Sequence, residues 1–303
     1  MTLTIAHMSD VHLAPLQGMG LQHLNIKRAL GLANWMLKRR KVHLRRAVDA
    51  LTADLARQKV DHIIVSGDLA NLGLPGEHVA ALDWLKNVGP PERVSVVPGN
   101  HDIYCRLWRD PGVERWRAYM TSCAKGSPFV PAGVAFPYVR ILGRVAIVGV
   151  NSAVPTRPFK AIGRVGDAQI EAVGRVLERL GAEGFVRVVV IHHPPLVGQA
   201  DASRGLTDAK SFEAMLVRYG ADLVLHGHND RDMHAVRRGP TAPIHVVGIA
   251  SASIGRAYKE EPLARYNLIK VEHGRPIEIE ARGISASCDT VAALGRRTLD
   301  ASG

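Results

Sequence analysis

Side chains that could bind a metal and move a proton follow five separate apolar stretches of this sequence. The pattern is densest at Asn100, His101 and Asp102, where an amide, an imidazole and a carboxylate follow the apolar run 94–97. The other four stretches are followed by Asp10 with His12, by Asp68, by His192 and by His228. These are oxygen and imidazole donors without a thiolate, a set that suits Mn, Fe, Zn and similar divalent ions. The residue types therefore predict a metal site with a group for proton transfer beside it.

The donor set is too large for a single ion. Two ions about 3.5–4 Å apart that share a bridging carboxylate would use all of it. Such a pair holds a phosphoryl group and makes hydroxide available near neutral pH. A solvated polar turn is the plain alternative at any one of these positions, but it does not explain why all five coincide. We therefore predict a two-metal site for phosphoryl chemistry.

The apolar stretches that must position these side chains are typical of buried strands. The first three, 3–8, 62–66 and 94–97, alternate with helical segments at 21–58 and 76–87. Successive strand–helix–strand units form a parallel sheet with right-handed crossovers, so the residues after these strands should meet at one sheet edge. Further strands are expected at 145–150, 186–191, 221–225, 244–249, 266–272 and 277–282, and further helices at 166–180 and 211–218.

The chain is predicted to form a single domain over residues 1–284, because it contains no repeat, low-complexity segment or linker. Two insertions interrupt that domain. One is a basic helical insertion at about 21–58. The other is a lid-like insertion at about 104–140, whose aromatic side chains need a surface to pack on. The tail, 285–303, is rich in small and polar residues, and we expect it to be loosely ordered.

Basic residues exceed acidic ones in this chain. Lys and Arg number 39 against 28 Asp and Glu, which gives a net charge of +11 over 303 residues. Such an excess favours anionic partners, namely phosphate esters, nucleic acid or an anionic membrane surface. Nucleic acid is the least favoured of the three, because the sequence shows no basic groove interleaved with aromatic residues for single strands.

The basic segment 27–46 has two interpretations. Its apolar residues follow a roughly helical spacing, Lys and Arg fill the gaps, and Trp35 lies between two basic clusters. The first interpretation is a packed helix pair with a solvated basic face. The second is an amphipathic helix that lies on an anionic membrane or guides an anionic substrate. Tryptophan with flanking cations is a grouping typical of membrane interfaces.

The cysteines and the start of the chain indicate a reducing compartment. Cys105, Cys123 and Cys288 are widely spaced and form no CxxC pair, which argues against a disulfide framework or a Cys-type zinc site. The chain enters a strand without a signal-peptide pattern, and it has no run of about 18 apolar residues. We therefore expect a cytoplasmic protein, placed peripherally on the inner membrane face if the basic segment docks there.

The ordered motifs resemble those of the calcineurin-like metallophosphoesterases, and more particularly their bacterial phosphodiesterase branch. The matching motifs are D-x-H at Asp10 and His12, G-D at Gly67 and Asp68, G-N-H-D at Gly99 to Asp102, a histidine at 192, and G-H at Gly227 and His228. This resemblance implies an α/β fold of four layers, an αββα sandwich of two mixed β-sheets flanked by helices.

The resemblance also implies a role for each residue. The implied metal ligands are Asp68 between two ions, Asp10 and His12 on the first ion, and Asn100, His192 and His228 on the second. His101 would stabilise or protonate the leaving oxygen, with Asp102 orienting it, and Asn100 and His101 would bind the substrate. His192 is preferred to His193 because the family's ligand follows its strand immediately.

One position departs from the family pattern. The last motif of the family is G-H-x-H, and here Asp230 occupies its fourth position. A carboxylate there could bind the first ion and favour a harder metal such as Mn²⁺ or Mg²⁺. Alternatively, the first ion is weakly bound or missing. If His226 and His228 are instead aligned with the two histidines of G-H-x-H, the motif's glycine has no counterpart before His226. We take Asp230 as a ligand.

These features together predict a phosphodiesterase with two divalent ions. Mn²⁺ is the favoured metal, and Fe, Zn or Mg are the alternatives. A metal-bound hydroxide would attack phosphorus in line. The basic segment favours a membrane-lipid phosphodiester, cleaved as a phospholipase C would cleave it. A soluble phosphodiester, either a cyclic nucleotide or a glycerophosphodiester, is the alternative substrate. A different class of function is also open, namely a degenerate, non-catalytic protein that binds a phosphate-bearing partner.

Overall fold

Two mixed six-stranded sheets form the centre of the computed structural model, which describes residues 2–107 and 109–299. The first sheet has the order β12-β11-β10-β1-β2-β3 and the second has the order β4-β5-β6-β7-β9-β8. The strands of the first sheet are β1 (Leu3–Met8), β2 (His62–Val65), β3 (Val94–Val96), β10 (Arg265–Val271), β11 (Ile277–Ile284) and β12 (Val291–Leu299). Those of the second are β4 (Tyr138–Leu142), β5 (Val145–Gly149), β6 (Val186–Val190), β7 (Leu223–His226), β8 (Met233–Arg238) and β9 (Pro243–Gly248).

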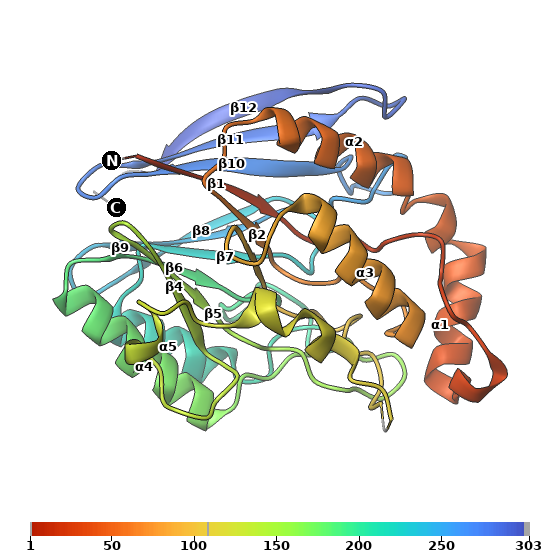
Figure 1. Ribbon diagram of the computed structural model, residues 1–303, viewed down its shortest axis with the longest axis horizontal. Coiled ribbons are helices and arrows are strands. Elements are labelled where there is room, and N and C mark those ends of the chain that lie inside the picture. Colours follow the sequence, from red (N-terminus) through yellow and green to blue (C-terminus); the bar gives the residue numbers. More distant parts are fainter. Residues whose placement is uncertain (1, 108, 300–303) are drawn as a thin grey trace.

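Helices cover the outer faces of both sheets. The α-helices are α1 (Ile26–Leu37), α2 (Arg45–Arg57), α3 (Pro75–Val88), α4 (Asp167–Ala182) and α5 (Ala209–Tyr219), and the 3-10 helices are η1 (Leu21–His23), η2 (Arg39–Lys41), η3 (Gly112–Met120) and η4 (Ser127–Phe129). Helices α2 and α3 lie on the side of the first sheet, and α4 and α5 lie on the side of the second (Figure 1). This helix–sheet–sheet–helix order confirms the predicted αββα sandwich.

The buried strand β6 shows why the central strands are mainly apolar. Val188 and Val190 join the core that includes the first sheet, whereas Val189 and Ile191 join the core beneath α4 and α5. Successive side chains of a strand point to opposite faces, so a strand covered on both sides needs apolar residues at every position. The result is the valine run 188–190, and the charged residue of β6, Arg187, pairs with Asp222 over 3.2 Å.

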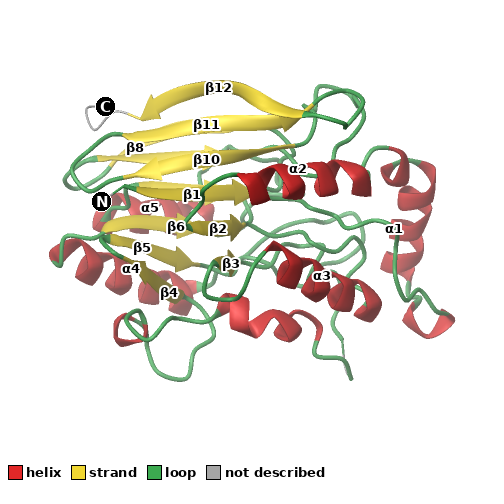
Figure 2. Ribbon diagram, turned by 45° about the horizontal axis from the view of Figure 1, so that its top comes forward, coloured by secondary structure: helices red, strands yellow, loops and turns green. Residues whose placement is uncertain are grey.

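Parallel pairing brings the strand ends together. Strand β1 pairs in parallel with β2, and β2 with β3 (Figure 2). In the second sheet β5, β6, β7 and β9 pair in parallel. The polar residues after these strands therefore lie at the carboxyl edges of the sheets. The main-chain N–H of His228 donates to Oδ2 of Asp10 over 2.9 Å, which joins the two edges directly.

The prediction of a loosely ordered tail has to be corrected. Residues 291–299 form β12, which pairs antiparallel with β11, so the prediction for 285–303 is wrong over that strand. Residues 300–303 lie outside the described part of the chain. Most side chains of β12 are exposed, so main-chain hydrogen bonds hold this edge strand rather than an apolar sequence pattern.

Within the segment predicted to be a lid-like insertion, 104–140, η3 packs against α3 and β3, and η4 packs against α4 and β4. Trp116 and Tyr119 of η3 are buried there. The indole N–H of Trp116 donates to the carbonyl of His78 over 2.9 Å, and the Tyr119 hydroxyl donates to the carbonyl of Gly89 over 3.2 Å. These aromatic side chains therefore serve as core. Within the described ranges, no helix is long and apolar enough to cross a membrane.

Candidate metal centre

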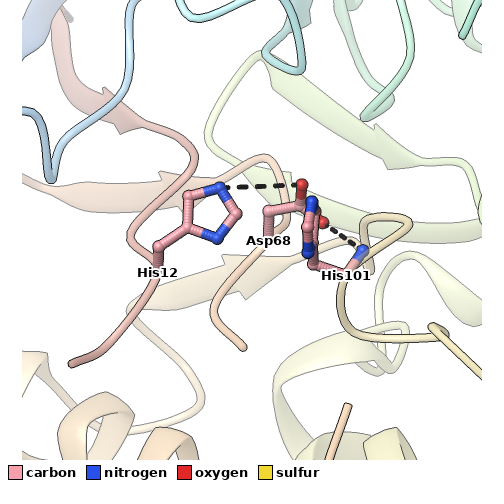
Figure 3. A group of neighbouring side chains, drawn as sticks. All are labelled: His12, Asp68 and His101. Atoms are coloured by element: carbon pink, nitrogen blue, oxygen red, sulfur yellow. Dashed lines mark hydrogen bonds and ion pairs between the residues drawn. The ribbon is translucent and has the colours of Figure 1, made fainter. Parts of the chain in front are cut away.

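The histidine and aspartate side chains predicted from the sequence come together at the carboxyl edges of the two sheets. Among the residues that the structure describes, three groups have ligand atoms that all lie within 4.8 Å of one another: Asp10–His12–Asp230, Asp68–His192–His228 and His12–Asp68–His101. The first two groups correspond to the two predicted ion positions. The third is drawn in Figure 3, where His12 and His101 lie on either side of Asp68.

The donor atoms of the second ion position lie around Nε2 of His192. That atom lies 3.3 Å from Oδ2 of Asp68, 3.2 Å from Oδ1 of Asn100 and 3.3 Å from Nδ1 of His228. Ligand atoms bound at roughly 2.1 Å to one ion lie roughly 3 to 3.5 Å from one another. The spacing therefore fits four donors around a single ion.

Main-chain carbonyls fix the orientation of the three histidines predicted as ligands. The contacts are His12 Nδ1 to the oxygen of Ala70 (2.9 Å), His192 Nδ1 to that of Ser66 (2.7 Å) and His228 Nε2 to that of Arg204 (2.7 Å). A carbonyl only accepts, so each of these nitrogens carries a hydrogen and the opposite ring nitrogen faces the site. Such partners are the usual second contact of a metal-binding histidine.

The first ion position is more open. Nε2 of His12 lies 3.8 Å from Oδ1 of Asp10 and 3.9 Å from Oδ2 of Asp68. Asp230 completes the group, and its Oδ1 is buried with no hydrogen-bond partner among the described residues. Burial and the charge of Asp10 raise the pKa of Asp230 to about 8. A buried carboxylate oxygen without a donor is unfavourable unless a proton or a cation neutralises it, so the position fits a metal ligand.

The alternatives considered for two histidines find less support in the geometry. His226 is buried and belongs to none of the three groups found in the described part of the chain. His193 uses both ring nitrogens elsewhere, Nδ1 on Oγ of Ser152 (2.8 Å) and Nε2 on the carbonyl of Ala161 (3.2 Å). The arrangement favours His192 and the register that ends in Asp230.

The charges of this site are strongly coupled. Burial alone would raise the pKa of Asp68, but His192 and His101 outweigh it and hold that pKa well below its usual range. Burial alone would lower the pKa of His192, yet Asp68 and Asp10 raise it to about 10. A proton on His192 therefore supplies positive charge where a divalent ion would supply it instead. The donor chemistry fits such an ion.

Five of the predicted ligands adopt a left-handed backbone conformation. Their φ angles are 53° at Asp10, 40° at His12, 56° at Asp68, 71° at His228 and 55° at Asp230. Residues other than glycine rarely adopt this conformation, and when they do they cluster at functional sites. Here these five left-handed residues all lie in the turns after β1, β2 and β7, which meet at the candidate metal site.

The motif glycines leave space for the carboxylates. A Cβ at Gly227 would overlap Oγ of Ser9 and lie 2.5 Å from Oδ2 of Asp10. A Cβ at Gly99 would overlap the carboxylate of Asp68. The G-H and G-N-H-D motifs thus need glycine because the carboxylates pass directly against the main chain.

Asp102, which is predicted to orient His101, has other partners for its carboxylate in the structure. The carboxylate of Asp102 accepts four main-chain N–H groups, those of Asp68, Leu69, Ala70 and Gly99, at 2.8–2.9 Å. With those bonds made, it is a brace for two turns rather than a partner of an imidazole.

His101 is held by other groups. Its Nδ1 donates to the carbonyl of Asn71 over 2.5 Å, and its main-chain N–H donates to Oδ1 of Asp68 over 2.7 Å (Figure 3). Its ring stacks on Tyr104 with centroids 5.6 Å apart. Burial is the main cause that lowers the pKa of His101, to about 4. The ring thus offers an unprotonated Nε2 at neutral pH.

Sequence reasoning missed several groups that support the site. The hydroxyls of Ser251 and Ser253 donate to the carbonyl of Asp10 over 2.7 and 2.8 Å. Arg204 donates from Nη2 to the carbonyl of His228 over 2.6 Å. These contacts depend on tertiary structure, so no local motif announces them.

Comparison with known proteins agrees with this geometry. Residues 3–230 match the calcineurin-like phosphoesterase family, and the chain belongs to that family. It is a metal-dependent phosphoric ester hydrolase. A probable cyclic nucleotide phosphodiesterase of Synechococcus sp. is 28% identical over 232 residues, which cover 75% of this chain and 73% of the relative.

Solved structures show the same fold. A dimetal phosphatase from Danio rerio has a TM-score of 0.59 at 12% identity, covering 96% of this chain and 98% of its own. A purple acid phosphatase from yellow lupin has a TM-score of 0.57 at 12% identity, and this chain spans 54% of its length. At such identities the likeness concerns the fold alone.

Proposed function

We propose that this chain is a dinuclear metal-dependent phosphodiesterase. The observation that carries the proposal is the position of Asp68 between the two donor groups. Its Oδ2 lies 3.3 Å from Nε2 of His192 and 3.9 Å from Nε2 of His12, as a bridging carboxylate requires. Two divalent ions bound there would activate water and neutralise the charge of a phosphoryl group, and Mn²⁺ is the metal we favour.

The residues of the chain would then position the substrate. With Oδ1 of Asn100 turned toward His192, its amide nitrogen remains to donate to a non-bridging oxygen. The unprotonated Nε2 of His101 lies beside Asp68 and His12. An anionic phosphodiester next to that ring would raise the pKa of His101, so the ring could carry the proton that the leaving oxygen takes up.

The surface of α1 favours a lipid phosphodiester as the substrate. This helix buries Lys27 and Arg28 and turns apolar side chains outward, with Ile26 76% and Leu37 70% exposed. Nζ of Lys27 donates to the carbonyl of Tyr104 over 2.7 Å, so the charged face is fixed inward. In Figure 1 the helix stands at the side of the molecule, away from both sheets.

Exposed cations adjoin this apolar surface. We define the docking patch as Leu21, Ile26, Met36, Leu37, Lys38, Arg40 and Lys41, all of which are exposed. Apolar side chains beside cations are the combination that binds an anionic bilayer surface. The proposed substrate is accordingly a membrane-lipid phosphodiester, cleaved as a phospholipase C would cleave it.

A soluble phosphodiester is the second candidate. The Synechococcus relative is described as a probable cyclic nucleotide phosphodiesterase. A cavity of about 730 Å³ adjoins the turn of His228, and Arg204, Asn229, Arg231 and Lys259 are among the residues that line it. Its size suits a small ester such as a cyclic nucleotide or a glycerophosphodiester, and its three cations are balanced by Asp201, Glu260 and Glu261.

Turnover of bis(p-nitrophenyl) phosphate by the Mn²⁺-loaded protein tests the proposed reaction. We expect hydrolysis that falls about 10²- to 10³-fold in Asn100→Ala, since that amide is proposed to hold the phosphoryl oxygen. A protein that holds both ions but hydrolyses no phosphodiester would instead support a degenerate, non-catalytic phosphate-binding role.

Sedimentation with phosphatidylglycerol vesicles tests the lipid substrate class. Binding should weaken as salt rises and should fall in an Ile26→Ser, Leu37→Ser double variant. No binding at low salt, together with turnover of 3′,5′-cyclic AMP, would favour the soluble substrate instead.

A further inference from the structure

The short helix η2 brings the basic insertion against the metal centre. The carbonyl of Arg39 accepts the main-chain N–H of His43 over 2.8 Å, so Arg39 lies one turn before that histidine. The ring of His43 packs edge-on against His12 with centroids 4.8 Å apart. Its Nδ1 contacts Oγ of Ser253 over 2.8 Å, and Ser253 in turn donates to the carbonyl of Asp10. The insertion is therefore anchored to the D-x-H turn.

Two nitrogen atoms of the half-buried Arg39 side chain lack a hydrogen-bond partner among the residues that the structure describes. Its Nε and Nη2 are buried and have no hydrogen-bond acceptor within the described ranges. Its neighbours Arg40 and Lys41 are exposed, as cations of a solvated insertion ordinarily are. Buried donors without an acceptor are unfavourable, and a charged group raises the cost further. No described residue supplies an acceptor for these two nitrogens, so a bound anion would satisfy them.

The charge of Arg39 acts on the first ion position. After burial, it is the next cause that lowers the pKa of both His12 and His43. The same charge adds to burial in lowering the pKa of His101, and at Asp230 it opposes burial and the charge of Asp10, which raise that pKa. Oδ1 of Asp230 has no partner either, so Arg39 does not serve as its hydrogen-bond donor. His12 and Asp230 belong to the first proposed ion position, and His43 and His101 adjoin it through the ring of His12.

We propose that Arg39 binds the phosphoryl group of the substrate, donating from Nε and Nη2 to its non-bridging oxygens. Two adjacent guanidinium N–H groups match two oxygens on one phosphorus in the bidentate geometry that arginine favours. Arg39 would thereby contribute to substrate affinity from a segment that contains none of the family's motifs. The inference rests on the proposed function, because it takes the phosphodiester of that site as the ligand.

A phosphate titration tests the role directly. The Mn²⁺-loaded full-length protein is titrated with inorganic phosphate by calorimetry, and its metal content is measured alongside kcat and KM for bis(p-nitrophenyl) phosphate. We expect Arg39→Ala to weaken phosphate binding roughly 10- to 100-fold and to raise KM while two ions are retained. Arg39→Lys should recover part of the affinity, because lysine keeps the positive charge but lacks the two adjacent N–H donors of the guanidinium.

Arg46 supplies the matched control. It is exposed on α2, and Arg46→Ala removes the same charge from the same insertion. Its phosphate affinity should equal that of the unaltered protein. Three results would each overturn the proposal: unchanged phosphate affinity in Arg39→Ala, an equal loss in Arg46→Ala, or loss of metal from both Arg39→Ala and Arg39→Lys.

The proposed function can fail independently of this role. If the unaltered protein hydrolyses no phosphodiester yet binds phosphate in an Arg39-dependent way, the phosphodiesterase assignment is wrong and the phosphate site stands. If the protein hydrolyses phosphodiesters but its phosphate affinity does not depend on Arg39, the phosphodiesterase assignment stands and the role of Arg39 is wrong.

Discussion

The main-chain N–H of Asp68 donates to Oδ2 of Asp102 over 2.9 Å, and this bond ties the G-D turn to the G-N-H-D turn. The N–H of Gly99 donates to the same oxygen, while Leu69 and Ala70 donate to Oδ1. One buried carboxylate thus sets the relative position of the turns that follow β2 and β3. The predicted bridging ligand, Asp68, depends on it for its place.

Replacing Asp102 should therefore destabilise the protein before it affects the chemistry. Asp102→Ala leaves four buried N–H groups without an acceptor, each costing about 1–3 kcal/mol. We expect the free energy of unfolding of the metal-free protein to fall by at least about 3 kcal/mol in urea titrations. Asp102→Asn keeps one oxygen and should lose less. A loss below about 1 kcal/mol in Asp102→Ala would contradict the bracing role.

The strands that carry the site were predictable because they are buried on both faces. Strands β1, β2, β3, β6 and β7 are short apolar runs that end in polar residues, so both the element and its functional end appear in the sequence. The edge strands β8 and β12 lack that signal. β8 alternates half-buried and exposed residues, and β12 is mostly exposed, so neither was predicted.

The supporting groups of the site could not be predicted for a different reason. Asn71 holds His101 through a main-chain carbonyl, and every residue type provides such a carbonyl. Arg39 is one of several adjacent basic residues, and only tertiary packing separates it from its exposed neighbours. The motif D-x-H also gives no sign that its residues adopt left-handed backbone conformations.

Asp230 should be required for the first ion. Its unpartnered Oδ1 lies in one group with Asp10 and His12, so Asp230→Ala removes a donor that no neighbouring group replaces. We expect two ions per chain in the unaltered protein and at least about tenfold weaker binding of one ion in Asp230→Ala. Elemental analysis after dialysis against graded Mn²⁺ measures this.

Asp230→His is the informative companion variant, because it restores the family's G-H-x-H motif. It should hold two ions, as the unaltered protein does. One ion in the unaltered protein, rising to two in Asp230→His, would show that the natural site is half-built and that Asp230 is not a ligand.

Metal binding should release protons. In the metal-free site Asp68 and Asp10 raise the pKa of His192 to about 10 against the effect of burial, and burial with Asp10 raises the pKa of Asp230 to about 8. Both groups hold a proton at pH 7 and must lose it to bind a cation, so the apparent Mn²⁺ affinity should increase from about pH 7 to pH 10. Calorimetry in two buffers of different ionisation enthalpy counts the protons. We expect one to two per chain at pH 7 and fewer in Asp230→Ala, and no release would contradict the assignment.

His101 should matter most for poor leaving groups. Its Nδ1 is fixed on the carbonyl of Asn71, and its Nε2 is free to pass a proton to a departing oxygen. His101→Gln should therefore lower kcat about 10²- to 10⁴-fold for an alkyl phosphodiester, which needs that proton. Bis(p-nitrophenyl) phosphate should lose far less, because p-nitrophenolate departs without one. The comparison of the two substrates controls for general damage to the site, and the metal content of the variant should stay at two ions. An equal loss for both substrates would show that His101 positions the phosphoryl group or the ions and does not donate a proton.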